Sequence, residues 1–137
     1  MLTTRPWGCY PVPNMSGKAP ILVIDDDPDL CELLRRTLES DGHTVVTAKD
    51  GMEAIRAYEL NRPSMLFVDL MMPQLDGEEL LRVLGTPRPP VVLITASVRR
   101  EEVAERFSIP DALEKPFDIE HVKALARKHL GLETSSE

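Results

Sequence analysis

The chain has 137 residues and a formal net charge of −7, with 42% hydrophobic and 28% charged residues. This length fits one globular domain, and an acidic balance lacks the basic surface that nucleic-acid-binding domains use. The longest apolar runs, at residues 21–24 and 91–94, are too short to cross a bilayer, and two cysteines make no disulfide framework. We therefore expect a cytoplasmic domain without direct nucleic-acid binding or membrane insertion.

Three segments of the chain differ in composition. Residues 1–18 are rich in proline and contain Arg5 and Lys18 but no acidic residue, which is typical of a disordered extension. Residues 132–137 form a short polar tail. We expect residues 19–131 to be the folded domain and, because nothing after Leu130 is long enough to fold, we expect this domain to act alone through its partners.

The first half of the domain alternates strands and helices. Apolar or β-branched runs predict strands at residues 21–24, 44–48 and 65–68. Two helices are expected between them, because apolar side chains recur there at helical spacing. The apolar positions are Leu30, Leu33, Leu34 and Leu38 in the first helix and Met52, Ala54, Ile55 and Tyr58 in the second.

The second half continues the alternation. It predicts helices at residues 77–84 and 99–107, strands at 91–95 and 112–114, and a last helix that Asp118 caps. Strands that alternate with helices favour one doubly wound parallel sheet, an α/β fold with helices on both faces. In such sheets ligands bind beyond the carboxyl ends of the strands.

A polar or charged side chain lies at the carboxyl end of four predicted strands. Asp25 and Asp26 follow the first strand, Asp69 follows the third, and Lys115 follows the fifth, while Thr95 ends the fourth. These residues are expected to meet at one edge of the sheet. Each has a simpler explanation alone, as a helix cap, turn former or strand residue, but their coincidence at four strand ends favours a site.

The residue types at this edge suit a divalent cation and a phosphoryl group. Clustered carboxylates repel one another unless a cation neutralises them, and Mg²⁺ prefers oxygen ligands and completes its shell with water or phosphate. A further carboxylate is able to accept a phosphoryl group covalently. A threonine hydroxyl and a lysine ammonium supply the hydrogen bond and the charge that stabilise phosphoryl oxygens.

Four motifs carry a resemblance to a known family. They are Ile-Leu-Val-Ile-Asp-Asp-Asp-Pro at residues 21–28, Val-Asp-Leu-Met-Met-Pro at 68–73 with Asp-Gly at 76–77, Ile-Thr-Ala-Ser at 94–97, and Glu-Lys-Pro-Phe at 114–117. In this order they resemble the receiver domain of bacterial two-component response regulators, over about residues 19–130. The resemblance implies a flavodoxin-like sheet of five parallel strands in the order 2-1-3-4-5.

The resemblance also implies a phosphoprotein of phosphorelay signal transduction. Asp69 would accept the phosphoryl group from a partner histidine kinase or phosphotransfer protein, and a downstream protein partner would receive the signal. Such a domain is not an enzyme beyond its own phosphotransfer and dephosphorylation.

Individual roles follow from the same resemblance. Asp25, Asp26, Asp69 and the backbone carbonyl of Met71 would hold Mg²⁺. Thr95 and Lys115 would contact the phosphoryl oxygens, and the peptide bond between Lys115 and Pro116 would be cis, as is usual in this family.

One departure keeps two alternatives open. Where the family has an aromatic residue on the fifth strand, three positions before Lys115, this chain has Ala112. A pseudo-receiver, which is an interaction module without a working phospho-switch, is therefore one alternative. The other is a haloacid-dehalogenase-like phosphatase, with Asp25 as nucleophile and Asp27 as acid–base group, although Asp29 stands where that family has Thr or Val.

Overall fold

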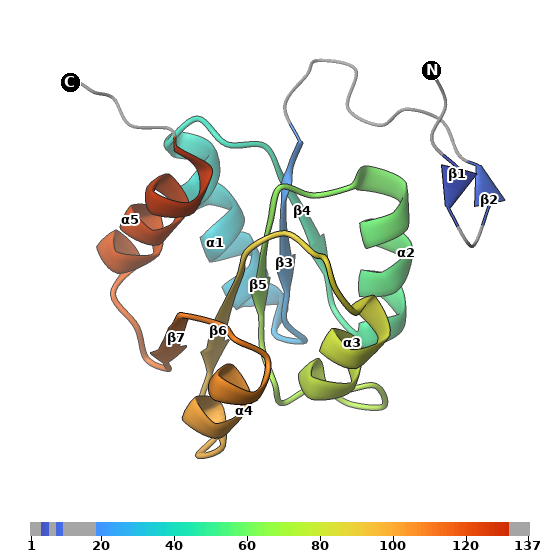
Figure 1. The fold of residues 1–137 in the computed structure, drawn as a ribbon. Coiled ribbons are helices and arrows are strands. Elements are labelled where there is room, and N and C mark those ends of the chain that lie inside the picture. The colour runs from blue at the N-terminus through green and yellow to red at the C-terminus, as the bar shows by residue number, and fades with distance from the viewer. Residues whose placement is uncertain (1–3, 6–7, 10–18, 132–137) are drawn as a thin grey trace.

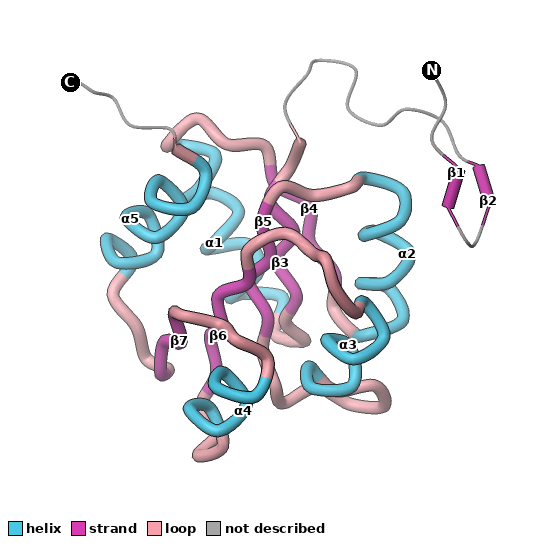
Figure 2. The backbone as a smooth tube through the Cα atoms, in the orientation of Figure 1, coloured by secondary structure: helices cyan, strands magenta, loops and turns pink. Residues whose placement is uncertain are grey.

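The computed structural model describes residues 4–5, 8–9 and 19–131. Within residues 19–131, one parallel sheet carries helices on both faces (Figures 1 and 2). The strands are β3 (Ile21–Ile24), β4 (Val45–Ala48), β5 (Met65–Val68), β6 (Val91–Thr95) and β7 (Asp111–Glu114). They lie in the order β4-β3-β5-β6-β7, and every pair is parallel. The predicted doubly wound sheet with order 2-1-3-4-5 is confirmed.

The helices follow the strands in regular alternation. They are α1 (Pro28–Ser40), α2 (Gly51–Asn61), α3 (Gly77–Leu84), α4 (Arg100–Arg106) and α5 (Ile119–Leu130). Four of them begin at an aspartate whose side chain accepts hydrogen bonds from backbone N–H groups of the first turn: Asp27, Asp50, Asp76 and Asp118. These caps satisfy donors that lack partners within the helix and place a negative charge at the positive end of its dipole.

The sheet separates two hydrophobic cores. On one face, α2, α3 and α4 pack on alternate strand residues such as Ile24, Val68 and Leu93. On the other face, α1 and α5 pack on residues of the opposite parity, including Val23 and Phe67. β3 and β5 are buried on both faces and apolar throughout, and β6 is apolar up to its last residue, Thr95, so these strands position the loops at their carboxyl ends rigidly.

Two predicted core positions are wrong. Leu33 and Met52 were expected on the apolar faces of their helices but are 41% and 56% exposed. In α1 the sheet covers a narrower stripe that runs through Cys31, Leu34 and Leu38, so that Leu33 lies outside it.

The ends of three elements also differ from the predictions. The strand expected at 44–48 begins at Val45, the helix expected at 99–107 spans Arg100–Arg106, and the strand expected at 112–114 begins at Asp111. Helix and strand ends commonly shift by a residue or two, because the terminal hydrogen bonds are incomplete.

Near the N-terminus, β1 (Thr4–Arg5) pairs antiparallel with β2 (Gly8–Cys9). The predictions for the remainder of residues 1–18 and for the tail at 132–137 concern positions outside the described residues. Within the described part of the chain, no helix has both the length and the apolar character needed to span a membrane.

Candidate functional site

The carboxyl ends of β3, β5 and β7 bring the predicted residues to one edge of the sheet. The backbone N–H of Asp25 donates to the Ala48 carbonyl at 3.0 Å, and that of Asp69 donates to the Ile24 carbonyl at 3.0 Å. The N–H of Lys115 donates to the carbonyl of Thr95 at 3.1 Å. These bonds continue the sheet by one residue and fix the Cα positions from which the three side chains project.

Lys115 binds two of the predicted carboxylates at once. Its Nζ lies 2.8 Å from Oδ2 of Asp25 and 2.9 Å from Oδ2 of Asp69. The two carboxylate side chains are only 4% exposed, whereas that of Lys115 is 25% exposed. Residues 46 and 90 positions away from Lys115 in sequence thus share one partly buried cation.

The remaining oxygens of these carboxylates bind backbone groups. Oδ1 of Asp25 accepts from the N–H of Asp27 at 2.9 Å, and Oδ1 of Asp69 accepts from the N–H of Met71 at 3.0 Å. Each carboxylate is therefore held by a side-chain ammonium and a main-chain donor, which fixes its orientation before any ligand binds.

Negative charge nevertheless exceeds positive charge at this edge. Burial raises the pKa of Asp25, and the nearby Asp69 carboxylate adds to the rise, although Lys115 and the Asp27 N–H partly offset it. For Lys115, burial opposes the charged form, but the hydrogen bonds to Asp25 and Asp69 outweigh it and raise the pKa of the ammonium. Lys115 therefore stays protonated, and because three carboxylates gather at this edge with a single ammonium, the site favours binding of a second cation.

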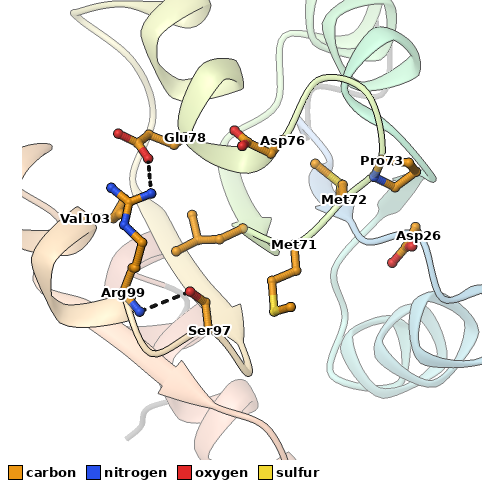
Figure 3. A pocket seen from close by; sticks show the side chains of 10 residues that line it. Asp26, Met71, Met72, Pro73, Asp76, Glu78, Ser97, Arg99 and Val103 are labelled. Atoms are coloured by element: carbon orange, nitrogen blue, oxygen red, sulfur yellow. Dashed lines mark hydrogen bonds and ion pairs between the residues drawn. The ribbon is translucent and has the colours of Figure 1, made fainter.

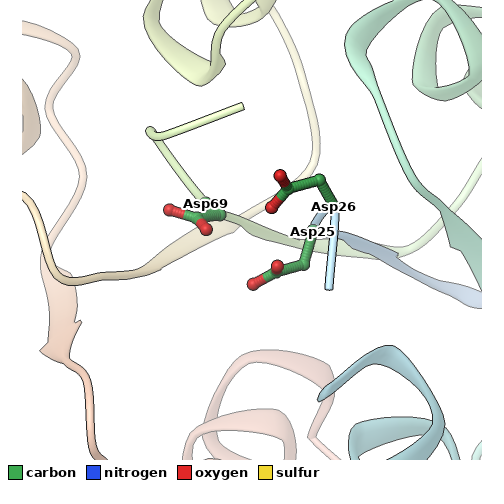
Figure 4. Close-up of side chains that lie close together, drawn as sticks. All are labelled: Asp25, Asp26 and Asp69. Carbon is green, nitrogen blue, oxygen red and sulfur yellow. The ribbon is translucent and has the colours of Figure 1, made fainter. Parts of the chain in front are cut away.

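Asp26 completes a set of oxygen donors that fits Mg²⁺. One carboxylate oxygen from each of Asp25, Asp26 and Asp69 lies within 4.8 Å of the others (Figure 4). Asp25 and Asp69 are buried and Asp26 is exposed, so the acidic cluster formed by these three residues opens to solvent on the Asp26 side. Hard oxygen donors with room for water ligands are the environment that Mg²⁺ prefers.

Thr95 lies at the end of β6, next to the acidic cluster in the sheet order, and is fully buried. Its Oγ1 accepts from the N–H of Ser97 at 3.2 Å, which leaves the hydroxyl proton for another acceptor. Met71 follows Asp69 closely and has a side chain that is largely exposed.

Neighbouring residues have structural roles. Oδ1 of Asp27 accepts from the N–H groups of Asp29 and Leu30, at 3.0 and 3.4 Å, and so caps α1. The Cys31 thiol is buried and donates to the carbonyl of Asp25 at 3.2 Å. Burial raises the pKa of Cys31 to about 11, and the nearby Asp25 charge contributes. The predicted cis bond between Lys115 and Pro116 is present.

A groove of about 380 Å³ opens beside the acidic cluster (Figure 3). Asp26 and Met71 line one side, and Glu78, Ser97 and Arg99 line the other. Glu78 and Arg99 carry no signal in the sequence, because a carboxylate and a guanidinium far apart in the chain form no local pattern. Their pairing is visible only once α3 and the loop before α4 are placed side by side.

Comparison with known proteins assigns the family. Residues 21–127 match the response regulator receiver domain family. The chain therefore belongs to this family, which consists of signalling domains of two-component systems.

Two curated relatives show the same relationship. Over 114 residues the chain is 42% identical to the response regulator MprA of Mycobacterium ulcerans (strain Agy99), a match that covers 78% of this chain and 48% of that protein. It is 43% identical over 114 residues to the response regulator MprA of Mycobacterium tuberculosis, with the same coverage. The chain spans about half the length of these relatives.

Solved structures agree in fold. The Francisella response regulator 1452 receiver domain matches with a TM-score of 0.76 and 28% identity, over 83% of this chain and 98% of that chain. The receiver domain of NtrX from Brucella abortus matches with a TM-score of 0.73 and 32% identity, over 82% and 99%. The haloacid-dehalogenase-like alternative gains no support. Its acid–base group would be Asp27, but the carboxylate of Asp27 accepts hydrogen bonds from the first turn of α1 as the helix cap.

Proposed function

We propose that this domain accepts a phosphoryl group on Asp69 from a partner histidine kinase or phosphotransfer protein, in the presence of Mg²⁺, and signals through contacts with other proteins. The observation that carries the proposal is the position of Lys115 Nζ, which binds Asp25 and Asp69 together at 2.8 and 2.9 Å. This contact joins the acidic cluster to a cation that is suited to phosphoryl oxygens.

In the proposed reaction, a carboxylate oxygen of Asp69 forms a bond to the phosphorus of the donor phosphohistidine. The phosphorus–nitrogen bond breaks, and its electron pair stays with the donor imidazole. The product is an acyl phosphate on Asp69. Because little covalent chemistry falls to the protein, its contribution is positioning and electrostatic stabilisation.

Lys115 supplies part of that stabilisation. Its ammonium already contacts Oδ2 of Asp69 at 2.9 Å, so it lies within reach of oxygens that a transferred phosphoryl group would bring there. Thr95, with its hydroxyl proton available, would donate to another phosphoryl oxygen.

Asp25, Asp26 and Asp69 would hold Mg²⁺, with the backbone carbonyl of Met71 as a further ligand. When bound, Mg²⁺ neutralises the clustered negative charge and lowers the repulsion between the carboxylates and the incoming phosphoryl group. The raised pKa of Asp25 is in line with this assignment, since burial and, to a lesser degree, the Asp69 carboxylate disfavour its charged form.

A second candidate function rests on Ala112. This residue is half-buried on β7 and packs against the core beneath α4, where it offers only a methyl group. A pseudo-receiver would bind partners through the same fold without a response to phosphorylation. The intact set of Asp25, Asp26, Asp69 and Lys115 favours the phosphoacceptor function over this candidate.

The test is incubation with Mg²⁺ and acetyl phosphate followed by intact mass measurement. The unmodified protein is expected to gain one phosphoryl group, and the Asp69→Asn variant none. Asp118→Asn is the matched control, because Asp118 caps α5, is not one of the residues of the acidic cluster, and asparagine caps equally well. An adduct that persists in Asp69→Asn but disappears in Asp25→Asn would contradict the proposal, and absence of any adduct would favour the pseudo-receiver.

A further inference from the structure

Glu78 binds three arginines at the edge of the groove. Its side chain is only 10% exposed. Oε2 lies 2.8 Å from Nη2 of Arg82 and also pairs with Nη1 of Arg106, while Oε1 lies 2.8 Å from Nη1 of Arg99. We call these four residues the arginine cluster. It has more positive than negative charge, so Glu78 stays paired if a single arginine is lost.

One side of the arginine cluster is fixed to the loop that carries Asp69. Glu78 is the second residue of α3 and directly follows Gly77, whose N–H donates to the carbonyl of Leu70 at 3.2 Å. A Cβ at Gly77 would lie 2.5 Å from the carbonyl oxygen of Asp69, which shows how closely α3 approaches this backbone. The position of Glu78 is therefore set by the phosphoacceptor loop.

The other side is fixed to the loop that directly follows Thr95, the last residue of β6. The backbone N–H of Arg99 donates to Oγ of Ser97 at 3.0 Å, and the N–H of Ser97 donates to Oγ1 of Thr95 at 3.2 Å. The Arg99 side chain crosses the groove edge from this loop to Glu78 (Figure 3). A continuous series of contacts thus joins Thr95 through Ser97 and Arg99 to Glu78.

We propose that Glu78 and Arg99 are positioning residues, whose ion pair holds the Thr95 hydroxyl at a fixed place relative to Asp69 for phosphoryl transfer. The inference rests on the proposed function of the same site. The pair completes a series of contacts that runs from the loop after β5 through Gly77, Glu78 and Arg99 to Ser97 and Thr95. A hydroxyl that is oriented in advance stabilises developing charge without rearranging during the reaction.

Arg99 is distinguished from the two other arginines by what it connects. Arg82 lies on α3 with Glu78, four residues further on, so their contact joins no separate segments. Arg106 lies at the end of α4 and holds that helix to Glu78 and, through Nη2, to Glu102 at 2.7 Å. Loss of the Arg99 side chain should therefore free the loop after Thr95, at residues 96–99, while α4 stays anchored.

The experiment compares Arg99→Ala with Arg82→Ala, which remove the same charge at the same distance from Glu78. We would measure the rate of phosphorylation by acetyl phosphate, the affinity for Mg²⁺ by calorimetry, and thermal unfolding. Arg99→Ala is expected to slow phosphorylation about tenfold and to leave Mg²⁺ affinity within about twofold, because the Mg²⁺ ligands do not depend on Thr95. Arg82→Ala should change neither quantity by more than about twofold.

A conservative variant, Arg99→Lys, distinguishes a positioning role of Arg99 from a general contribution to stability. Arg99→Lys keeps a cation that reaches Glu78, so acetyl phosphate should phosphorylate it faster than it phosphorylates Arg99→Ala. Equal rates in Arg99→Ala and Arg82→Ala would overturn the inference, as would a loss of Mg²⁺ affinity in Arg99→Ala that parallels its rate. Absence of phosphorylation in the unmodified protein would contradict the proposed function as well, whereas equal rates in the variants contradict the inference alone.

Discussion

The acidic cluster and the arginine cluster contain the same kinds of charge in opposite proportions. The acidic cluster contains three carboxylates, those of Asp25, Asp26 and Asp69, and one ammonium, that of Lys115, lies against two of them, Asp25 and Asp69. In the arginine cluster one carboxylate, that of Glu78, contacts three guanidinium groups. Both clusters contribute to the same groove: the acidic cluster through Asp26, and the arginine cluster through Glu78 and Arg99.

The difference separates a binding site from a structural connection. Burial, with a smaller contribution from the Asp69 carboxylate, raises the pKa of Asp25, so the acidic cluster is stabilised by taking up a proton or a cation. A carboxylate with several guanidinium partners is already neutralised, and the pKa of Glu78 is lowered instead. The first cluster is suited to a ligand, and the second joins segments of the protein.

The largest expected effect comes from removing the one cation of the acidic cluster. Lys115→Ala should slow phosphorylation by acetyl phosphate about 100-fold, the scale seen when one donor to a developing charge is lost. The fold should persist, because Lys115 is a quarter exposed and belongs to neither hydrophobic core. Rate measurement and circular dichroism check both expectations.

The control for this variant is Lys123→Ala, which removes a lysine that pairs with Glu120 at 3.8 Å on α5. Acetyl phosphate should phosphorylate Lys123→Ala at the same rate as the unmodified protein. An unfolded Lys115→Ala protein would show that the ammonium holds the fold together.

A smaller effect is expected from reducing the negative charge of the acidic cluster. Without Mg²⁺ at pH 7, Asp25→Asn should raise the free energy of unfolding by about 1.5 kcal/mol, because ionised Asp25 is disfavoured by burial and by Asp69. The folded-state pKa of Asp25 is raised above 3.8, so the unmodified protein gains stability as the pH falls through that raised pKa. The advantage of the variant should therefore shrink in acid.

Urea unfolding at several pH values measures this difference. Added Mg²⁺ should stabilise the unmodified protein and leave Asp25→Asn nearly unchanged. Destabilisation of Asp25→Asn at pH 7 without Mg²⁺ would show that the cluster carries no surplus charge.

The smallest effect on the free energy of unfolding is expected in the arginine cluster. Its pH dependence is opposite to that of Asp25, because the pKa of Glu78 is lowered. Burial opposes the charge of Glu78, but Arg99, Arg106 and Arg82 outweigh it and hold its pKa below 4.5. The stabilisation is therefore complete above pH 4.5 and is lost as the pH falls through the lowered pKa. Glu78→Gln should cost about 1 kcal/mol at pH 7, since the arginines are 41–57% exposed and solvent screens the pairs.

Urea unfolding of Glu78→Gln and the unmodified protein should give curves of stability against pH that converge below pH 4.5. A difference that stays constant into acid would mean that Glu78 stabilises α3 by packing and not by its charge.

The strands were predictable because burial on both faces leaves a simple pattern. The runs at Met65–Val68 and at residues 91–94 are apolar without interruption and are bounded by polar or turn-forming residues. Once those strands are recognised as parallel, the meeting of Asp25, Asp69 and Lys115 at one edge follows from topology. This is why the acidic cluster could be predicted from residues far apart in sequence.

Helix faces and the arginine cluster were harder to predict. Leu33 has the same helical spacing as its neighbours, but how wide a stripe the sheet covers depends on how α1 is rotated, which spacing alone does not fix. Glu78 and Arg99 meet only through the packing of α3 beside the loop before α4. Long charged side chains select partners after the backbone is placed, so their pairs leave no periodic signal.

The most direct test of the account is to locate the phosphoryl group chemically. After treatment with Mg²⁺ and acetyl phosphate, borohydride reduces an aspartyl phosphate to homoserine, which peptide mass spectrometry then places in the sequence. The account predicts homoserine at position 69 alone. Homoserine at position 25 or 26, or no conversion at any aspartate, would contradict it.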